Sequence, residues 1–272
     1  KHDETNSGGS FGTAQETGHG SQSRDVKAPV MPERVGAARP LVLPPPWSEW
    51  VTNSVLYPQR MVEVPTMSAE VQAALMDRVR QTDSIEEKVK ILRWLSYRGD
   101  SSVVPLMLET MTQRYKGRGL TVNDSIRLTG IAHLLGLMAR QDNAAFEFLQ
   151  NHCDPAVWDA NPPWNLALGH YDAVSLAGSC LRGLAVSGRP EAFAILERFR
   201  SAPLGSTEPD LARQVAEAAF QCAQVRDLGL ERALDEVFLT LTTSLQYWNR
   251  WAGQSAEGRQ WMEWLTKQGA AP

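Results

Sequence analysis

The chain has 272 residues, of which 43% are hydrophobic and 21% are charged, and its formal net charge at pH 7 is −4. This composition is ordinary for a globular protein and allows a sizeable core to be buried. Proteins that bind duplex nucleic acid usually carry a basic excess, so the acidic balance argues against a nucleic-acid partner. No long uninterrupted apolar run occurs, so the sequence predicts no membrane span.

Residues 1–40 predict a disordered tail. They are rich in Gly, Ser, Thr, Gln and Pro, and too poor in apolar side chains to offset the entropy lost on ordering. Three widely spaced cysteines, Cys153, Cys180 and Cys222, indicate neither a disulfide framework nor a metal-binding knuckle. The first residue, Lys1, and the polar tail favour an exported or periplasmic protein, whereas the unpaired cysteines favour the cytoplasm.

Residues 41–66 contain three consecutive prolines followed by Trp47 and Trp50. Prolines fix φ and favour extended polyproline II backbone. We therefore expect an extended Pro/Trp-rich arm whose tryptophans lie against the rest of the protein. The alternative is that this segment is a peptide motif offered to an aromatic-lined groove on a partner.

Helical periodicity begins at Ser68, from which apolar residues recur at intervals of three and four. Ser84 and Glu87 have the spacing of a capping box, in which each side chain accepts a hydrogen bond from a free backbone N–H of the first turn. Gly99 predicts the end of that helix, because glycine tolerates a left-handed conformation. We predict a helical domain over residues 67–272.

The helical pattern repeats along the chain. Leu95, Leu137 and Leu184 recur near predicted helix ends at intervals of 42 and 47 residues, and Gly136 and Gly183 coincide at the second interval. Such intervals are typical of two-helix HEAT units.

The segments 92–107 and 183–193 resemble units of the HEAT-repeat superfamily. Each has a helix end, a short polar turn and a small or β-branched pair before a second apolar helix. The resemblance covers residues 84–240 and implies an all-α, right-handed α-solenoid of stacked helix pairs that binds other proteins and carries no catalytic residues. The later units lack a proline equivalent to Pro105, and residues 161–164 interrupt the array.

Tryptophans are concentrated near the C-terminus, where Trp248, Trp251, Trp261 and Trp264 lie at helical spacing. Two such pairs could form a cage around a ligand. We favour packing as core and cap of the helical array, because tryptophan contributes mainly buried area.

The insertion at residues 158–172 is the strongest candidate for chemistry. A histidine next to a carboxylate, as in His170 and Asp172, could act as a base and its orienting partner, with Trp164 against a ligand. No GxSxG elbow accompanies them. In the simpler interpretation, His170 and Tyr171 pack where the insertion enters the next helix, and Asp172 is its N-cap.

The remaining histidines and cysteines indicate structure. His152 and Cys153 end a helix, where the dipole favours a cationic imidazole and does not favour a thiolate. Cys180 and Cys222 occupy matching positions of successive units and predict core packing, and His133 predicts a hydrogen-bonded interior or boundary histidine. No phosphate-binding loop or HExxH motif occurs, so we expect no catalytic residue, cofactor or metal.

The sequence therefore predicts a non-enzymatic scaffold that binds a protein or peptide. Its candidate contact residues are Trp47, Trp50, Trp164, His170 and Asp172. The alternative is an enzyme or small-ligand-binding protein with its site in the insertion at residues 158–172.

Overall fold

The computed structural model describes residues 42–52, 64–112, 120–159, 168–203, 205–239 and 241–270, with side chains at all of these except 235–247. All of them belong to one compact unit, residues 40–272. Every regular element in these ranges is a helix and none is a strand, so the all-α prediction is confirmed. None of the described helices is long and apolar enough to cross a bilayer. The tail predicted at residues 1–40 lies outside the described residues.

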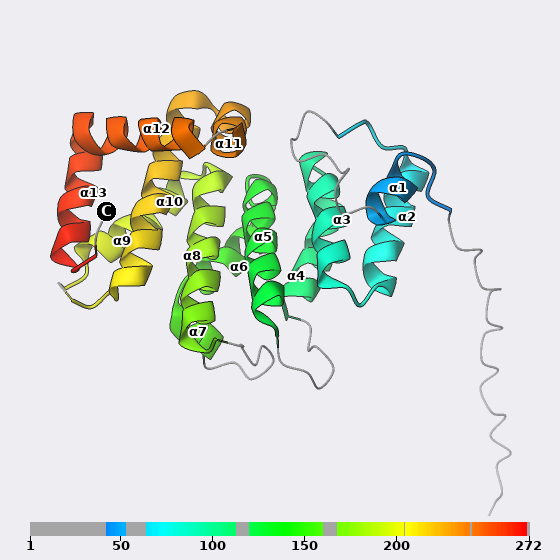
Figure 1. Cartoon of the computed structure of the whole chain (residues 1–272), viewed down its shortest axis with the longest axis horizontal. Coiled ribbons are helices and arrows are strands. Elements are labelled where there is room, and N and C mark those ends of the chain that lie inside the picture. Colours follow the sequence, from blue (N-terminus) through cyan, green and yellow to red (C-terminus); the bar gives the residue numbers. More distant parts are fainter. Residues whose placement is uncertain are drawn as a thin grey trace, which may run out of the picture. The chain divides into compact units, whose positions relative to one another are not determined.

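Figure 1 shows the described helices coloured in chain order. In chain order they are α1 (Trp47–Thr52), α2 (Ala69–Gln81), α3 (Ile85–Tyr97), the 3-10 helix η2 (Ser101–Val103), α4 (Val104–Thr112), α5 (Val122–Met138), α6 (Asn143–Asn151), α7 (Pro155–Asp159), α8 (His170–Ser187), α9 (Pro190–Ser201), α10 (Pro209–Leu228), α11 (Leu230–Leu239), α12 (Leu241–Gln254) and α13 (Ala256–Lys267).

Local side chains determine where many of these helices begin. A side-chain oxygen at the N-cap accepts a hydrogen bond from a first-turn N–H at five of the α-helix starts that the structure describes, and each such cap stabilises its helix by about 1 kcal/mol. These caps are Ser68, Ser84, Thr121, Asp142 and Ser255. Proline occupies the first position of α9 and α10, where its missing N–H is of little consequence.

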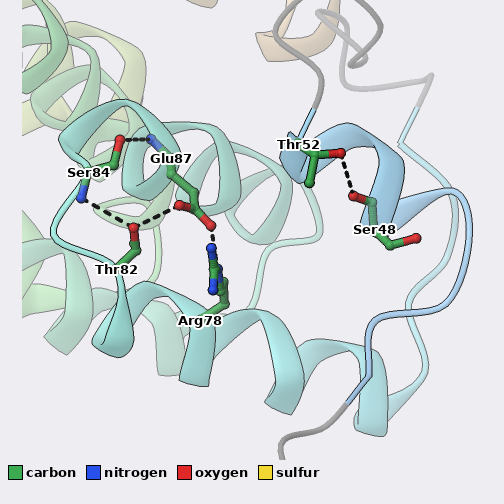
Figure 2. A network of polar contacts seen from close by, with 6 residues as sticks. All are labelled: Ser48, Thr52, Arg78, Thr82, Ser84 and Glu87. Atoms are coloured by element: carbon green, nitrogen blue, oxygen red, sulfur yellow. Dashed lines mark hydrogen bonds and ion pairs between the residues drawn. The ribbon is translucent and has the colours of Figure 1, made fainter.

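The turn between α2 and α3 forms only half of the predicted capping box (Figure 2). The Ser84 hydroxyl accepts the Glu87 N–H at 3.3 Å, as expected. The Ser84 N–H, however, donates to the Thr82 hydroxyl at 3.2 Å. Glu87 is instead engaged by the Thr82 hydroxyl, at 2.7 Å, and by the guanidinium of Arg78. The reciprocal contact is therefore replaced by one that joins α3 to the end of α2.

Part of the predicted arm is helical. Residues 47–52 form α1, so the extended conformation predicted for the arm is wrong there. The preceding prolines supply acceptors for the first turn, because the Pro44 carbonyl accepts the Ser48 N–H and the Pro46 carbonyl accepts the Trp50 N–H. The Thr52 hydroxyl donates to the Ser48 carbonyl at 3.1 Å (Figure 2). Residues 53–63 of the arm lie outside the described residues.

Four helices form the centre of the described unit. Helices α3, α5, α8 and α10 pack against one another in that order, and α4, α6 and α9 pack against this row (Figure 1). Glu86 and Arg127 join the starts of α3 and α5, and Gly136 and Gly183 join α5 to α8 near their ends. Helices α3, α5 and α8 therefore run parallel. The contacts of α8 with α10 give the same direction for α10, because Gly178 lies against Gln214 and Arg182, one turn later, pairs with Glu217.

The closest approach in the row lies between α5 and α8. A Cβ atom on Gly136 would lie 2.2 Å from the carbonyl oxygen of Gly183, and a Cβ on Gly183 would lie 2.5 Å from that of Ala132. Both distances are far inside van der Waals contact, so neither position has room for a side chain. This packing explains why glycines recur at the same place in the two sequence units.

The predicted repeat positions are buried. Leu95, Leu137 and Leu184 lie within the last turns of α3, α5 and α8, and all three belong to the hydrophobic core. The predicted burial of these three positions near helix ends is confirmed.

Candidate functional site

His170 joins three elements of the fold. It is the first residue of α8, and its Nδ1 atom lies 2.5 Å from a carboxylate oxygen of Asp159, the last residue of α7. Its Nε2 atom lies 3.0 and 3.1 Å from the carboxylate oxygens of Glu208, the residue before α10. We call Asp159, His170 and Glu208 the His170 cluster.

The two carboxylates favour the cationic form of the ring. Hydrogen bonds with Asp159 and then with Glu208 raise the pKa of His170 above its usual value. An imidazolium donates from both nitrogens, as this arrangement requires, whereas a neutral ring can donate from only one. Because the side chain is 57% exposed, water weakens these interactions.

The His170 cluster is poorly arranged for catalysis or metal binding. A base needs a nitrogen lone pair directed at a substrate, and both nitrogens already face carboxylates. The carboxylates lie on opposite sides of the ring, so the three groups do not converge on one point. The part of the chain that the structure describes contains no group of three or more His, Cys, Asp or Glu side chains placed to hold a metal.

Asp172 has a structural role that differs from the predicted one. The N-cap of α8 is Gly169, with φ at 53°, a conformation that favours glycine. Asp172 is buried in the first turn and accepts the Leu168 N–H at 2.9 Å. The N-cap prediction is therefore wrong. The predicted packing of Tyr171 is wrong too, because its side chain is 62% exposed.

The other predicted site residue of the insertion, Trp164, lies outside the described residues. At the start of the insertion, Trp158 is buried and its indole N–H donates to the carbonyl of His152 at 2.8 Å. The structure thus brings His170 and Asp172 to the same helix start, with different partners.

The predicted contact residues Trp47 and Trp50 pack together against α3. Their ring centroids lie 5.1 Å apart, and each lies 5.8 Å from the centroid of Trp94. Trp47 is only 4% exposed, so its indole is part of the core in this structure. Such packing matches the expected contact with the helical domain more closely than a motif offered to a partner.

The C-terminal tryptophans are in mutual contact. Phe220, Trp248 and Trp251 have centroids separated by 5.1 to 5.5 Å, and Trp261 and Trp264 by 5.5 Å. Rings at these distances touch one another and leave no space for a ligand between them. This geometry favours the core-and-cap interpretation over a ligand cage.

The described thiols are poor nucleophiles. Burial raises the pKa of Cys153 to about 11 and that of Cys222 to about 12, and it also raises the pKa of the fully buried Cys180. Near neutral pH these groups are protonated, and the thiol is the unreactive form.

His152 differs from the expectation based on the helix dipole. Burial lowers its pKa, and its Nδ1 atom lies 2.8 Å from the carbonyl oxygen of Phe148. Desolvation therefore outweighs the dipole, and the ring is favoured in its neutral form.

Sequence reasoning missed Asp159 and Glu208 as partners of His170. Glu208 is 38 residues away in sequence, and no local pattern connects the two. The recurring helical pattern was a sequence signal for this contact, because neighbouring helices that run parallel place the starts of α8 and α10 close together.

Comparisons with known proteins add no assignment. No family model, no curated protein and no solved structure matches this chain. Functional inference therefore depends on the geometry of the described residues.

Proposed function

We propose that this chain is a non-enzymatic scaffold that binds a protein or peptide through an α-solenoid of HEAT type. The observation that carries the proposal is the parallel row of α3, α5, α8 and α10, with α4, α6 and α9 packed against it. Consecutive helix pairs thus lie next to each other in chain order, which is the arrangement that stacked repeats require.

Such an arrangement supports binding for a physical reason. A single helix pair cannot bury its apolar face, so each pair depends on its neighbours, and stacking produces an extended surface built from successive pairs. The glycine contact between α5 and α8 fixes the separation of two neighbouring pairs. A surface held at fixed spacing can engage a partner with little loss of its own conformational entropy.

An enzyme centred on residues 158–172 is the less favoured function. Within the described residues, both nitrogens of His170 face carboxylates, and the carboxylate of Asp172 accepts a hydrogen bond from the Leu168 N–H. The buried thiols are protonated. These groups have structural partners that account for their positions.

Affinity capture tests the proposal. The purified full chain is immobilised and exposed to a lysate of its source cell, and captured proteins are identified by mass spectrometry. Each is then purified and titrated against the chain by calorimetry. We expect at least one to bind with defined stoichiometry. The absence of any stoichiometric partner, together with turnover of a small molecule that His170→Gln abolishes, would favour the enzyme.

A further inference from the structure

His170 differs from the other histidines that the structure describes. Burial lowers the pKa of His152 and, together with the positive charges of Arg182 and Arg93, lowers that of His133 to about 4. The Nε2 atom of His133 is covered and has no hydrogen-bond partner, unlike the hydrogen-bonded histidine that we predicted. Among the described histidines, only the ring of His170 has a raised pKa, so it can change its charge near neutral pH.

Helices α8 and α10 both begin without a side-chain N-cap. Gly169 has no side chain to supply one, and the carboxylate of Glu208 makes no hydrogen bond with the first turn of α10. That carboxylate lies 3.0 Å from Nε2 of His170, the first residue of α8. The residue that begins α10 is therefore held to α8 by an ion pair with His170.

Two carboxylates dominate the electrostatic surroundings of the His170 ring. Among the described residues, Asp159 of α7 and Glu208 are the charged groups that shift its pKa, and none of α5, α6 or α9, which also pack against α8, contributes another. Asp172 of the same helix accepts a backbone N–H, and Asp210 of α10 pairs with an arginine of its own helix at 3.7 Å. The charge of the ring is therefore coupled to Asp159 and Glu208.

The helix itself disfavours the cationic ring. His170 is the first residue of α8 and lies at the positive end of the helix dipole, where a cation is unfavourable. The pKa is nevertheless raised, so the two carboxylates outweigh the dipole. The cation is thus maintained by its contacts with Asp159 and Glu208.

A neutral ring cannot keep both contacts. One of its nitrogens then donates a hydrogen bond and the other carries a lone pair. A lone pair that faces a carboxylate oxygen forms no hydrogen bond and is repelled. The Asp159 contact is the shorter one, at 2.5 Å against 3.0 Å for Glu208. We therefore expect the remaining proton to stay on Nδ1 and the Glu208 contact to be lost.

We propose that the His170 cluster is a pH-sensitive link between α7, α8 and α10. As a cation, the ring joins Asp159 to Glu208. As a neutral ring, it keeps Asp159 and releases Glu208, which loosens the first turn of α10. The starts of α8 and α10 are thus held together more firmly at mildly acidic pH. This inference does not rest on the scaffold proposal, because the link is a contact within the chain.

The direction of the pH dependence follows from the raised pKa of His170. The ring is mainly cationic at and below pH 6.5, its usual pKa value, and the link is complete there. The link is lost as the pH rises through the folded-state pKa.

Amide hydrogen exchange followed by NMR of the full chain tests the link. The Ala212 N–H donates to the Glu208 carbonyl at 2.9 Å, which is the first hydrogen bond of α10, so its exchange reports on that turn. After correction for the intrinsic pH dependence of exchange, its protection should fall about threefold to fivefold from mildly acidic to mildly alkaline pH, as expected for an exposed ion pair. The corresponding Ser125 N–H at the start of α5, which donates to the Thr121 carbonyl, should keep its protection.

Two variants that each remove one negative charge separate the link from a general effect of charge. The amide of Glu208→Gln can accept a hydrogen bond from the cationic ring and donate one to the lone pair of the neutral ring, so Ala212 should stay protected at both pH values. Asp210→Asn, at a side chain that is 62% exposed and paired within α10, should retain the pH dependence of the unaltered chain. Equal behaviour of the two variants would overturn the inference, as would protection of Ala212 that does not change with pH in the unaltered chain.

The ¹⁵N chemical shifts of the ring give a second readout, because they distinguish a proton on Nδ1 from a proton on Nε2. At alkaline pH we expect the proton of His170 on Nδ1, facing Asp159. The variant His170→Gln identifies the resonances. A proton on Nε2 would show that Asp159 is released in place of Glu208, and the proposed loosening of α10 would be wrong.

Discussion

The pKa values of two histidines in this protein are shifted in opposite directions by their surroundings. His170, exposed between two carboxylates, has a raised pKa, whereas His133, covered and flanked by arginines, has a pKa lowered to about 4. The same residue type is therefore favoured as a cation at the start of α8 and as a neutral ring within α5.

The raised pKa of His170 predicts a pH-dependent contribution to stability. A histidine whose folded-state pKa exceeds its unfolded value stabilises the fold fully below the unfolded pKa, near 6.5, and this contribution is lost as pH rises through the folded pKa. Replacing His170 with Gln should therefore reduce the free energy of unfolding most at mildly acidic pH. Because the side chain is exposed, the loss should be at most about 1 kcal/mol.

Urea denaturation at mildly acidic and mildly alkaline pH measures this effect. The variant Asp159→Asn removes the closer carboxylate and should show the same trend. A His170→Gln variant whose stability followed that of the unaltered chain at every pH would show that the His170 cluster contributes nothing.

At the scale of helices, contacts local in sequence were predictable and contacts between elements were not. Ser84 and Glu87 lie within one turn, so the hydrogen bond from the Glu87 N–H to the Ser84 hydroxyl could be predicted from the sequence. The second bond of the predicted capping box is absent, because the Ser84 N–H donates to Thr82 instead. The arm was misassigned at α1, because the carbonyls of the proline run can also accept the first bonds of a helix.

The contact between α5 and α8 predicts an unfavourable Gly136→Ala substitution. Alanine favours a helix over glycine by about 1 kcal/mol. At Gly136, however, the added methyl group would meet the backbone of Gly183, which cannot move aside as a flexible side chain could. We expect a net loss of stability of about 1–3 kcal/mol from overpacking.

Gly130 of the same helix provides the matched control. A Cβ there would lie 3.6 Å from a methyl group of Val89, an ordinary contact. Gly130→Ala should therefore be neutral or stabilising in thermal and urea unfolding. Equal effects at Gly130 and Gly136 would mean that α5 and α8 are not in backbone contact.

For the molecule as a whole, the repeat was the most informative signal in the sequence. The spacing of similar residues pointed to the buried leucines near the helix ends and to the paired glycines, because residues at similar levels of neighbouring parallel helices meet similar surroundings. It did not identify the partners of His170. Those contacts join side chains of different helices. The positions of these helices relative to one another are known only from the three-dimensional structure.

Leu95, Leu137 and Leu184 test the repeat register. All three are buried, so truncating any one to Ala should reduce the free energy of unfolding by about 2–5 kcal/mol. The control is Ile126→Ala on α5, whose side chain is 61% exposed and which should change stability by about 0.5 kcal/mol or less. Small effects at two of the three leucines would refute the alignment.

The last prediction separates the scaffold from the enzyme. Replacing His170 with Gln and Asp172 with Asn keeps side chains of similar size, so the start of α8 should lose at most about 2 kcal/mol, the upper end for a lost cap. If the chain is a scaffold, this variant should bind the partner with unchanged affinity, because a surface built from several helix pairs does not depend on two side chains at one helix start. The affinities of this variant and of the unaltered chain are measured by calorimetry after circular dichroism has shown that the variant is folded. A loss of biological activity in the His170/Asp172 variant with partner binding intact would favour chemistry at residues 158–172, since a binding surface elsewhere would be unaffected by those two changes.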